Sequence, residues 1–323
     1  MQTIQQTFNS VSYKVEEPLI LENGQILRDL RIHYTTHGEL NESKTNVVWV
    51  FHALTANSDP IGWWPGVVGE GTFIDPDKDF IICANMLGSC YGSTEPTSYD
   101  FPLLTIGDLV RAHKELKDHL GIRKVKIGIG GSMGGQQLLE WAVQEPDLFE
   151  NMVLLATNAK HSAWGIAFNE AQRMALRLDG QKGIEAARAI AMLSYRNYIT
   201  YEHSQTDNDH RLNDYSASSY QNYQGQKLAK RFSPISYYYL SKAMDSHDVG
   251  RYFQSSESAL NRIRSKTIVI GLDTDLLFPI SDQQFIAEHI PNASLHVITS
   301  NYGHDGFLTE AKEITKILIK ELT

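Results

Sequence analysis

A serine flanked by glycines is the first feature of the sequence that could do chemistry. The stretch GGSMG (130–134) fits the pattern G-x-S-x-G and lies between a β-branched run and a run with helical spacing. A sharp strand-to-helix turn of this kind exposes the serine hydroxyl at the start of the helix. Small residues two positions before and after the serine let the chain bend. The sequence therefore predicts Ser132 as a nucleophile, with Gly130 and Gly134 permitting the turn.

The start of the helix after Ser132 can also stabilise negative charge. Its first backbone N–H groups have no partner within the helix, so the N–H of Met133 can point at an oxyanion forming beside the serine. Two other interpretations share this short pattern: a glycine-rich turn in an ordinary α/β protein, and a phosphate-binding loop of the dinucleotide type. Residues elsewhere in the chain must decide between them.

A nucleophile of this type needs two partners, an acid after a later strand and a histidine after the last one, in the chain order Ser, Asp, His. Asp273 and Asp275 follow one apolar run, and His304 follows the final run. A neutral imidazole can take the proton of the serine hydroxyl, and a carboxylate on its other nitrogen fixes the tautomer. Aspartates after strands are often only turn or cap residues. We favour Asp275 over Asp273 as the partner of His304.

Short apolar runs recur along the chain and predict the elements that carry these residues. They lie at 46–54, 79–87, 124–131, 151–159, 266–272 and 294–299. Continuous apolar runs of this length are typical of strands buried on both faces. Helical patterns at 106–120 and 136–144 alternate with them, and a last helix is expected at 306–322. The fold class predicted is α/β, with a mostly parallel sheet flanked by helices.

Two segments depart from this alternation. Residues 7–38 alternate apolar and polar positions around Asn23-Gly24, which predicts antiparallel strands joined by a hairpin. Residues 161–256 contain consecutive helical patterns, for example at 169–178, and no strand candidate. We therefore expect an α/β core formed by 1–160 and 257–323, with a helical cap, or lid, inserted at 161–256.

Composition excludes several classes of function. The 323 residues carry a formal net charge of −9, which repels nucleic acid and anionic membranes. No leader and no apolar run of membrane-spanning length is visible, so a cytoplasmic location is expected. Two cysteines, Cys83 and Cys90, are too few for a disulfide framework, and with His52 they fit no common zinc spacing. We expect no metal and no tightly bound cofactor.

Several longer segments resemble one known family. They are HALT (52–55), CANMLGSCYGSTEP (83–96), GGSMGGQQLLEWA (130–142), AFNEAQR (167–173), DLLFP (275–279) and YGHDGFL (302–308). Together they resemble homoserine O-acetyltransferase, an acyltransferase of the α/β-hydrolase fold, over most of the chain. The resemblance implies that Ser132, Asp275 and His304 form the catalytic triad. It also implies that Leu54 and Met133 supply the amides of the oxyanion hole.

The resemblance implies a set of residues that recognise the substrate. Arg188 and Tyr195 are seven residues apart, which places them two helical turns apart on one face. They match the substrate-binding arginine and tyrosine of the family, and the guanidinium suits the carboxylate of an amino acid. Asp305 follows His304 directly, and the resemblance implies that it holds the substrate ammonium group.

The resemblance also implies a two-step reaction. Ser132 attacks the thioester of the co-substrate acetyl-CoA, coenzyme A leaves, and the hydroxyl of L-homoserine then attacks the acetyl-serine with His304 as base. Candidates for binding the coenzyme A phosphates are Lys227, Lys230 and Arg231, although such a charge run is usually a solvated face. A homodimer formed through the cap helices is expected from the family.

The chain departs from the family at two places. Ala56 stands where the family usually has glycine, and the segment between Arg173 and Arg188 is shorter than in typical members. Three other functions stay open at this point. They are a homoserine or serine O-succinyltransferase, a serine carboxylester hydrolase with the same triad, and a catalytically silent binding protein, since fold alone does not fix chemistry.

Overall fold

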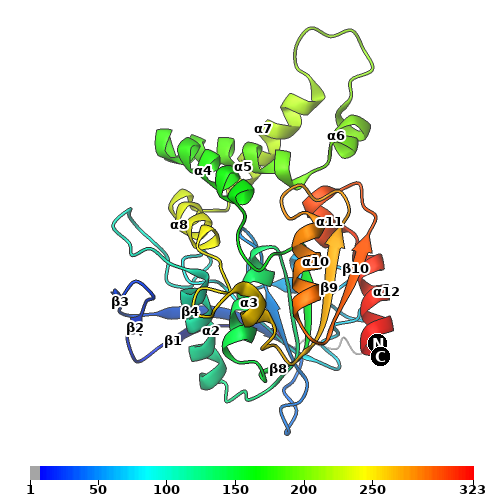
Figure 1. Ribbon diagram of the computed structural model, residues 1–323. Coiled ribbons are helices and arrows are strands. Elements are labelled where there is room, and N and C mark those ends of the chain that lie inside the picture. The colour runs from blue at the N-terminus through cyan, green and yellow to red at the C-terminus, as the bar shows by residue number, and fades with distance from the viewer. Residues whose placement is uncertain (1–7) are drawn as a thin grey trace, which may run out of the picture.

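One eight-stranded sheet forms the centre of the computed structural model, which describes residues 8–323 (Figure 1). In spatial order its strands are β1 (Phe8–Lys14), β4 (Arg31–His37), β6 (Phe80–Ala84), β5 (Val47–Phe51), β7 (Val125–Gly131), β8 (Phe149–Leu155), β9 (Lys266–Leu272) and β10 (Ala293–Ile298). Strands β1, β4 and β6 pair antiparallel, and every other neighbouring pair is parallel. The predicted mostly parallel α/β sheet is confirmed.

The antiparallel segment near the N-terminus is also confirmed. β1 pairs with β4, and the two-residue strands β2 (Leu19–Ile20) and β3 (Ile26–Leu27) pair across the turn at Asn23-Gly24. Gly24 has φ +81°, a left-handed conformation that suits glycine. Residues 1–7 lie outside the described residues. They include residue 7 of the predicted antiparallel range and the start of the N-terminal stretch in which no leader is visible. Within residues 8–323, no helix is long and apolar enough to cross a bilayer.

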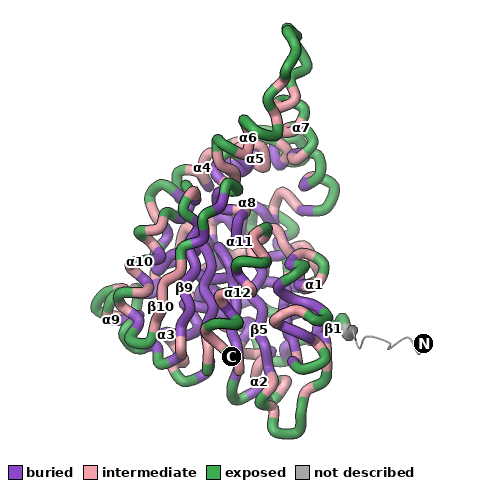
Figure 2. The backbone as a smooth tube through the Cα atoms, turned by 90° about the vertical axis from the view of Figure 1, so that its right-hand side faces the viewer, coloured by how far each residue is buried: buried purple, intermediate pink, exposed green. Residues whose placement is uncertain are grey.

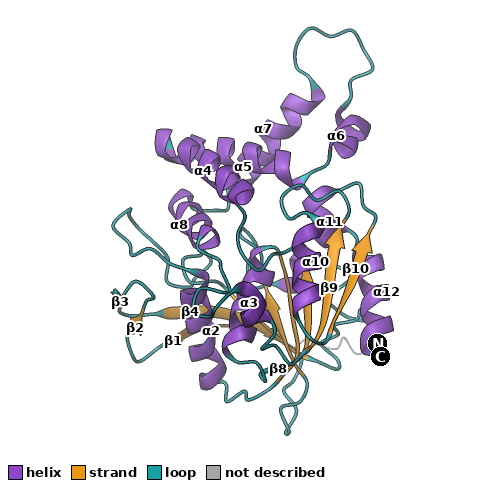
Figure 3. Ribbon diagram, in the orientation of Figure 1, coloured by secondary structure: helices purple, strands orange, loops and turns teal. Residues whose placement is uncertain are grey.

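The inner strands of the parallel part are buried on both faces, as their apolar runs predict. The prediction is wrong for β10, which is the edge strand and is only half-buried, with Val297 50% exposed. In β5, Trp49 and Phe51 belong to one apolar cluster and Val48 and Val50 to another, because successive side chains point to opposite faces. Figure 2 shows this buried layer running through the middle of the molecule, and Figure 3 shows helices on both sides of the strands. The sheet is therefore a rigid support whose carboxyl ends can carry precise loops.

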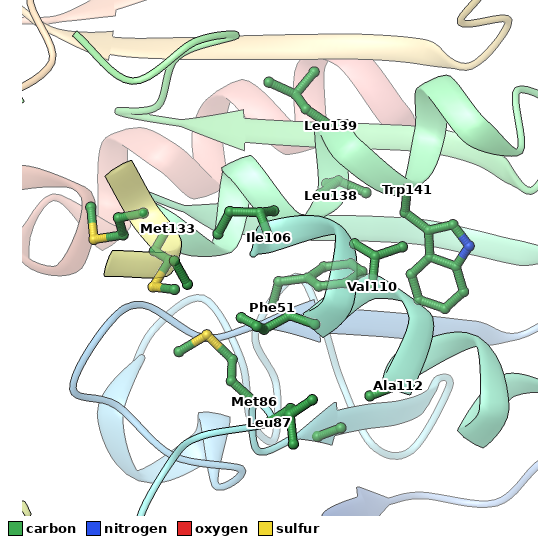
Figure 4. Packing of buried hydrophobic residues seen from close by; sticks show 14 of the residues in the cluster. Phe51, Met86, Leu87, Ile106, Val110, Ala112, Met133, Leu138, Leu139 and Trp141 are labelled. Atoms are coloured by element: carbon green, nitrogen blue, oxygen red, sulfur yellow. The ribbon is translucent and has the colours of Figure 1, made fainter. Parts of the chain in front are cut away.

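The helices that cover the core have the following bounds: α1 (Pro60–Trp63), α2 (Ile106–His119), α3 (Met133–Gln144), α9 (Ser256–Leu260), α10 (Ile280–His289), α11 (Gly306–Thr309) and α12 (Ala311–Leu322). Helix α3 packs against β5 through Trp141. The Trp141 ring meets the Trp49 ring edge to face, with the ring centroids 5.1 Å apart. Figure 4 shows Trp141, Leu138 and Val110 together with Phe51 in this packing. The start of α3 is thereby fixed relative to the end of β5.

The single last helix predicted at 306–322 is wrong. The chain forms a 3₁₀ turn η1 (Gly303–Asp305), then α11, and breaks at Glu310 (φ −89°, ψ +39°) before α12. The indole N–H of Trp64 donates to the Phe307 carbonyl at 3.0 Å, a carbonyl that Ala311 would need in a continuous helix. The break lets α12 bury Ile314 on the sheet face opposite α3.

Five of the six helices between β8 and β9 lie over the carboxyl ends of the parallel strands (Figure 1). They are α4 (Ala163–Leu178), α5 (Gly180–Tyr195), α6 (Tyr198–Gln205), α7 (Ser216–Ala229) and α8 (Pro234–Asp245). Asp179 ends α4 and caps α5, so these two helices form a tight hairpin. The α6–α7 arm projects away from the core in Figures 1 and 2. Residues 161–256, named the cap above, contain all five helices.

Candidate active site

Ser132 lies at the turn between β7 and α3, with φ +55° and ψ −127°. A non-glycine residue in this region stores backbone strain. A Cβ placed on Gly134 would lie 2.1 Å from the carbonyl oxygen of Phe51, and one placed on Gly130 would lie 2.6 Å from backbone atoms of Gly134. Larger residues at either position would therefore push the turn away from the sheet.

Hydrogen bonds to the backbone of Ser132 hold the strained turn in place. Its N–H donates to the Leu155 carbonyl at 3.0 Å. Its carbonyl accepts from the N–H of Gln136 at 3.1 Å and from the hydroxyl of Thr157 at 2.8 Å. The backbone N–H and carbonyl of Ser132 therefore have hydrogen-bond partners in β8, in α3 and in the loop after β8. The serine side chain, only 6% exposed as a residue, faces a cavity.

His304 lies in η1 after the last strand and is paired with Asp275, which follows β9. The Nδ1 of His304 lies 2.7 Å from Oδ2 of Asp275, and both side chains are buried. A carboxylate only accepts, so Nδ1 carries a proton, and in the neutral form of the ring Nε2 keeps its lone pair. The other oxygen of Asp275 accepts from the backbone N–H groups of Leu277 (2.8 Å) and Phe278 (2.9 Å). The carboxylate is therefore held in one orientation toward the histidine.

Asp273 has a different environment from Asp275. Its Oδ1 accepts the backbone N–H of Ser300 at 3.0 Å and so ties the loop after β9 to the loop after β10. This contact is a turn role of the kind that aspartates commonly have after strands. The two loops that carry Asp275 and His304 are kept together by it.

A cavity of about 560 Å³ contains the serine and the histidine. Its lining comprises Ala53, Leu54, Thr55, Ala56, Asn57, Asp59, Gly62, Trp63, Tyr91, Ser132, Arg188, Tyr195, Arg231, His304, Asp305, Phe307 and Leu308. Loops at the carboxyl ends of the strands form its floor, and Arg188, Tyr195 and Arg231 come from the cap. The cavity therefore brings together a serine hydroxyl from the core and cationic groups from the cap.

Leu54 and Met133 are the residues predicted to supply oxyanion-hole amides, and Met133 directly follows Ser132 in the chain. Leu54 lines the cavity from the loop after β5, and Met133 is the buried first residue of α3. The N–H of Met133 therefore has no acceptor within its own helix. Ala56 stands where the family usually has glycine. Its backbone N–H donates to the Ala53 carbonyl at 3.0 Å and closes a turn. Its φ is not positive, so the substitution introduces no backbone strain.

Arg188 and Tyr195 meet on one face of α5, as their spacing predicts. The guanidinium carbon of Arg188 lies 5.3 Å from the centre of the Tyr195 ring, an arrangement typical of a cation–π contact. The Tyr195 ring lies 5.6 Å from the His304 ring. Burial raises the pKa of Tyr195, so its phenol stays protonated at neutral pH. Half-buried Arg188 thus lies over the Tyr195 ring, which in turn lies beside His304.

Asp305 lines the same cavity, and its carboxylate has a partner that the sequence did not reveal. Arg196, at the end of α5, forms an ion pair with it, Nε to Oδ2 at 2.8 Å, and lies over the ring of Tyr302 at 5.6 Å. Burial raises the pKa of Asp305, and the charges of Arg196 and Arg188 act against that increase. The only sequence signal for Arg196 is its position directly after Tyr195.

Of the three cations proposed for coenzyme A, one lines the cavity. Arg231 donates from Nη1 to the carbonyl of Thr55 at 2.6 Å and to the hydroxyl of Tyr91 at 2.7 Å. Lys227 and Lys230 lie on and just after α7, outside the cavity lining. Arg231 therefore joins the cap to the loop that carries Leu54.

His52, Cys83 and Cys90 each have different surroundings. His52 Nε2 accepts the N–H of Met86, and Cys90 Sγ accepts the N–H of Ser233. Burial raises the pKa of the Cys83 thiol. Among residues 8–323, no three His, Cys, Asp or Glu side chains are grouped so that they could hold a metal ion.

These groups together can carry out acyl transfer. A serine at a helix start, an imidazole oriented by a carboxylate, and a backbone amide without a partner in its own helix are components of nucleophilic catalysis at an acyl carbon. The carboxylate of Asp305 and the guanidinium of Arg188 add opposite charges to the same cavity. Such a pair suits a second substrate with both an anionic and a cationic group.

Comparison with known proteins agrees with this chemistry. The family model described as alpha/beta hydrolase fold matches residues 46–311. A homoserine O-acetyltransferase from Cyclobacterium marinum is 46% identical over 94% of this chain and 92% of its own length. The solved homoserine O-acetyltransferase from Staphylococcus aureus is 28% identical with a TM-score of 0.86, covering 97% and 95% of the two chains. Esterase E22 is 22% identical with a TM-score of 0.89, over 98% and 100%, which shows the shared fold.

Gly134→Ala tests the steric basis of the turn. The added methyl would collide with the Phe51 carbonyl, so we expect a loss of about 3 kcal/mol in the free energy of unfolding. Acyl transfer should fall with it, because the serine is displaced. Gly180→Ala is the matched control: its methyl meets nothing within 4 Å, and chemical denaturation should show equal or slightly higher stability. Equal stability of both variants would contradict the steric account.

Asp275→Asn tests the pairing with His304. The amide can leave the imidazole in the wrong tautomer, so we expect kcat for acyl transfer to fall by about 10⁴-fold with the protein still folded. Asp273→Asn is the control, since an asparagine oxygen can still accept the Ser300 N–H. A steady-state assay that found the larger loss in the Asp273 variant would reverse the assignment.

Proposed function

The chain belongs to the homoserine O-acetyltransferase family of α/β-hydrolase-fold proteins, and we propose that it transfers the acetyl group of acetyl-CoA to the hydroxyl of L-homoserine. The product is O-acetyl-L-homoserine, an intermediate for methionine biosynthesis. One observation carries the proposal furthest. The serine and histidine share a cavity with Arg188 and Asp305, which can bind the two charged groups of an amino acid.

In the first half-reaction Ser132 attacks the thioester carbonyl carbon while Nε2 of His304 takes the hydroxyl proton. Asp275 holds the imidazole in this tautomer and stabilises the positive charge that develops on it. The N–H groups of Leu54 and Met133 bind the oxyanion. When the carbon–sulfur bond breaks, His304 returns the proton to sulfur and coenzyme A leaves as the thiol. The acetyl group remains as an ester on Ser132.

In the second half-reaction the hydroxyl of homoserine attacks this ester, with His304 again as base. Arg188 binds the substrate carboxylate from above, with Tyr195 packed beneath its guanidinium. Asp305, which lines the same cavity, binds the ammonium group. Collapse of the intermediate breaks the bond to Ser132 and returns the proton to its oxygen. The cap over the cavity favours the bound amino acid over water as the acceptor.

The proposal also includes the cofactor requirement, the oligomeric state and the cellular location. Acetyl-CoA acts as an exchanging co-substrate, with no tightly bound cofactor. A homodimer through the cap helices is supported by the exposure of Met174, Leu178 and Leu193 on α4 and α5, of which Leu178 is 88% exposed. A cytoplasmic location agrees with two free cysteines, Cys83 and Cys90, as expected in a reducing compartment.

Release of coenzyme A tests both substrates at once. We would supply acetyl-CoA or succinyl-CoA, each with homoserine, with serine, or with water alone as acceptor, and follow the free thiol. The proposal predicts homoserine-dependent release from acetyl-CoA. Preference for succinyl-CoA would keep the mechanism and reject the donor. Equal release with and without an amino acid would make the protein a hydrolase.

Arg196→Gln tests how Asp305 binds the ammonium group. The positive charge of Arg196 lowers the pKa of Asp305, so without that charge the pKa of Asp305 should rise further. The neutral acid cannot pair with an ammonium group, so KM for homoserine should increase about tenfold, and more steeply as the pH falls. Arg177→Gln, which removes an exposed ion pair with Glu170, is the control. A KM profile identical to the wild type would exclude this role for Arg196.

A further inference from the structure

We propose that His52 is a positioning residue that orients the first amide of the oxyanion hole. It follows β5 directly, is 1% exposed, and is not among the residues that line the cavity. Its Nδ1 lies 2.9 Å from the carbonyl oxygen of Ala53, and its Nε2 lies 3.1 Å from the backbone nitrogen of Met86. The ring therefore lies between the Leu54 loop and the chain that leaves β6.

The contact with Met86 decides which ring nitrogen carries the proton. A backbone N–H can only donate, so Nε2 must accept, and the single proton of a neutral ring must be on Nδ1. Burial lowers the pKa of His52 to about 4, so the ring is neutral at physiological pH. His52 thus donates from Nδ1 to the Ala53 carbonyl.

This hydrogen bond fixes a peptide unit that also contains the amide of Leu54. In a trans peptide the carbonyl of one residue and the N–H of the next point in opposite directions, and residues 8–323 contain no cis peptide. The Ala53 carbonyl accepts from His52 Nδ1 and from the N–H of Ala56 at 3.0 Å. With the carbonyl held on that side, the Leu54 N–H must point the other way. The Leu54 N–H can therefore point into the cavity, which Leu54 and Ser132 both line.

A second buried contact relates this loop to the other oxyanion amide. The side-chain amide of Gln137 on α3 donates to the carbonyl of His52 at 3.3 Å and to the carbonyl of Met133 at 3.1 Å. His113 in turn contacts the Gln137 oxygen at 3.0 Å. The loop that presents Leu54 and the helix start that presents Met133 are therefore held at a fixed separation.

Two substitutions of His52 separate its two hydrogen bonds. The amide nitrogen of asparagine reaches the position of Nδ1, so His52→Asn can keep the donor to Ala53 and lose the contact with Met86. The amide oxygen of glutamine reaches the position of Nε2, so His52→Gln can keep Met86 and lose Ala53. His247→Asn is the control, because His247 is also buried and contacts a backbone carbonyl, that of Asn158, at 2.9 Å.

The inference rests on the proposed roles of Ser132 and Leu54, but not on the identity of the acceptor. We would therefore measure hydrolysis of p-nitrophenyl acetate beside coenzyme A release with homoserine. His52→Gln should lower kcat with the ester by about 10- to 100-fold at unchanged KM, near the loss of one oxyanion donor. His52→Asn should retain most activity, and His247→Asn should match the wild type. If the wild type hydrolyses the ester but does not acetylate homoserine, the proposed acceptor is wrong. The comparison of the His52 variants with the ester still tests this inference.

Equal kcat in folded His52→Gln and wild type, or a larger loss in His52→Asn than in His52→Gln, would overturn the inference. A measurement on the wild type removes any dependence on folding of the variants. Nitrogen NMR of histidine-labelled protein should show His52 neutral with the proton on Nδ1. A proton on Nε2 would exclude donation to the Ala53 carbonyl and overturn the proposal.

Discussion

The close approach of α3 to the end of β5 is the constraint on which the site depends. The main chain at Gly134 passes so near the Phe51 carbonyl that no Cβ fits between them. This contact forces the sharp turn, gives Ser132 its positive φ, and places the helix start beside the loop that follows β5. The aromatic packing of Trp141 against Trp49 supplies apolar burial that holds α3 there.

The parallel sheet gives this turn its partners. Because the carboxyl ends of parallel strands meet at one edge, the loops after β5, β7, β9 and β10 lie together at that edge of the sheet. Each loop contributes one kind of group: a backbone amide, a hydroxyl, a carboxylate or an imidazole. The cap adds the guanidinium of Arg188 to the same cavity. The fold alone does not fix the chemistry of such a core, so the proposed preference for an amino acid depends on the charges of Arg188 and Asp305.

Much of the core could be predicted from sequence because its signals are local. Apolar runs marked the strands, and the chain order Ser, Asp, His marked Ser132, Asp275 and His304 as candidates. Contacts between distant segments left no such signal. The ion pair of Arg196 with Asp305 depends on how α5 ends above η1. The break before α12 depends on an indole from residue 64 binding the Phe307 carbonyl, which no local pattern at 306–322 encodes.

An acetyl group on Ser132 is the most direct test of the account. The protein would be mixed with acetyl-CoA without an acceptor, quenched in acid and analysed by intact mass and peptide mapping, with Ser132→Ala as control. We predict one added acetyl group on the peptide that contains Ser132, lost on addition of homoserine and absent in the variant. An acetyl group on another residue, or full turnover by Ser132→Ala, would contradict the central claim.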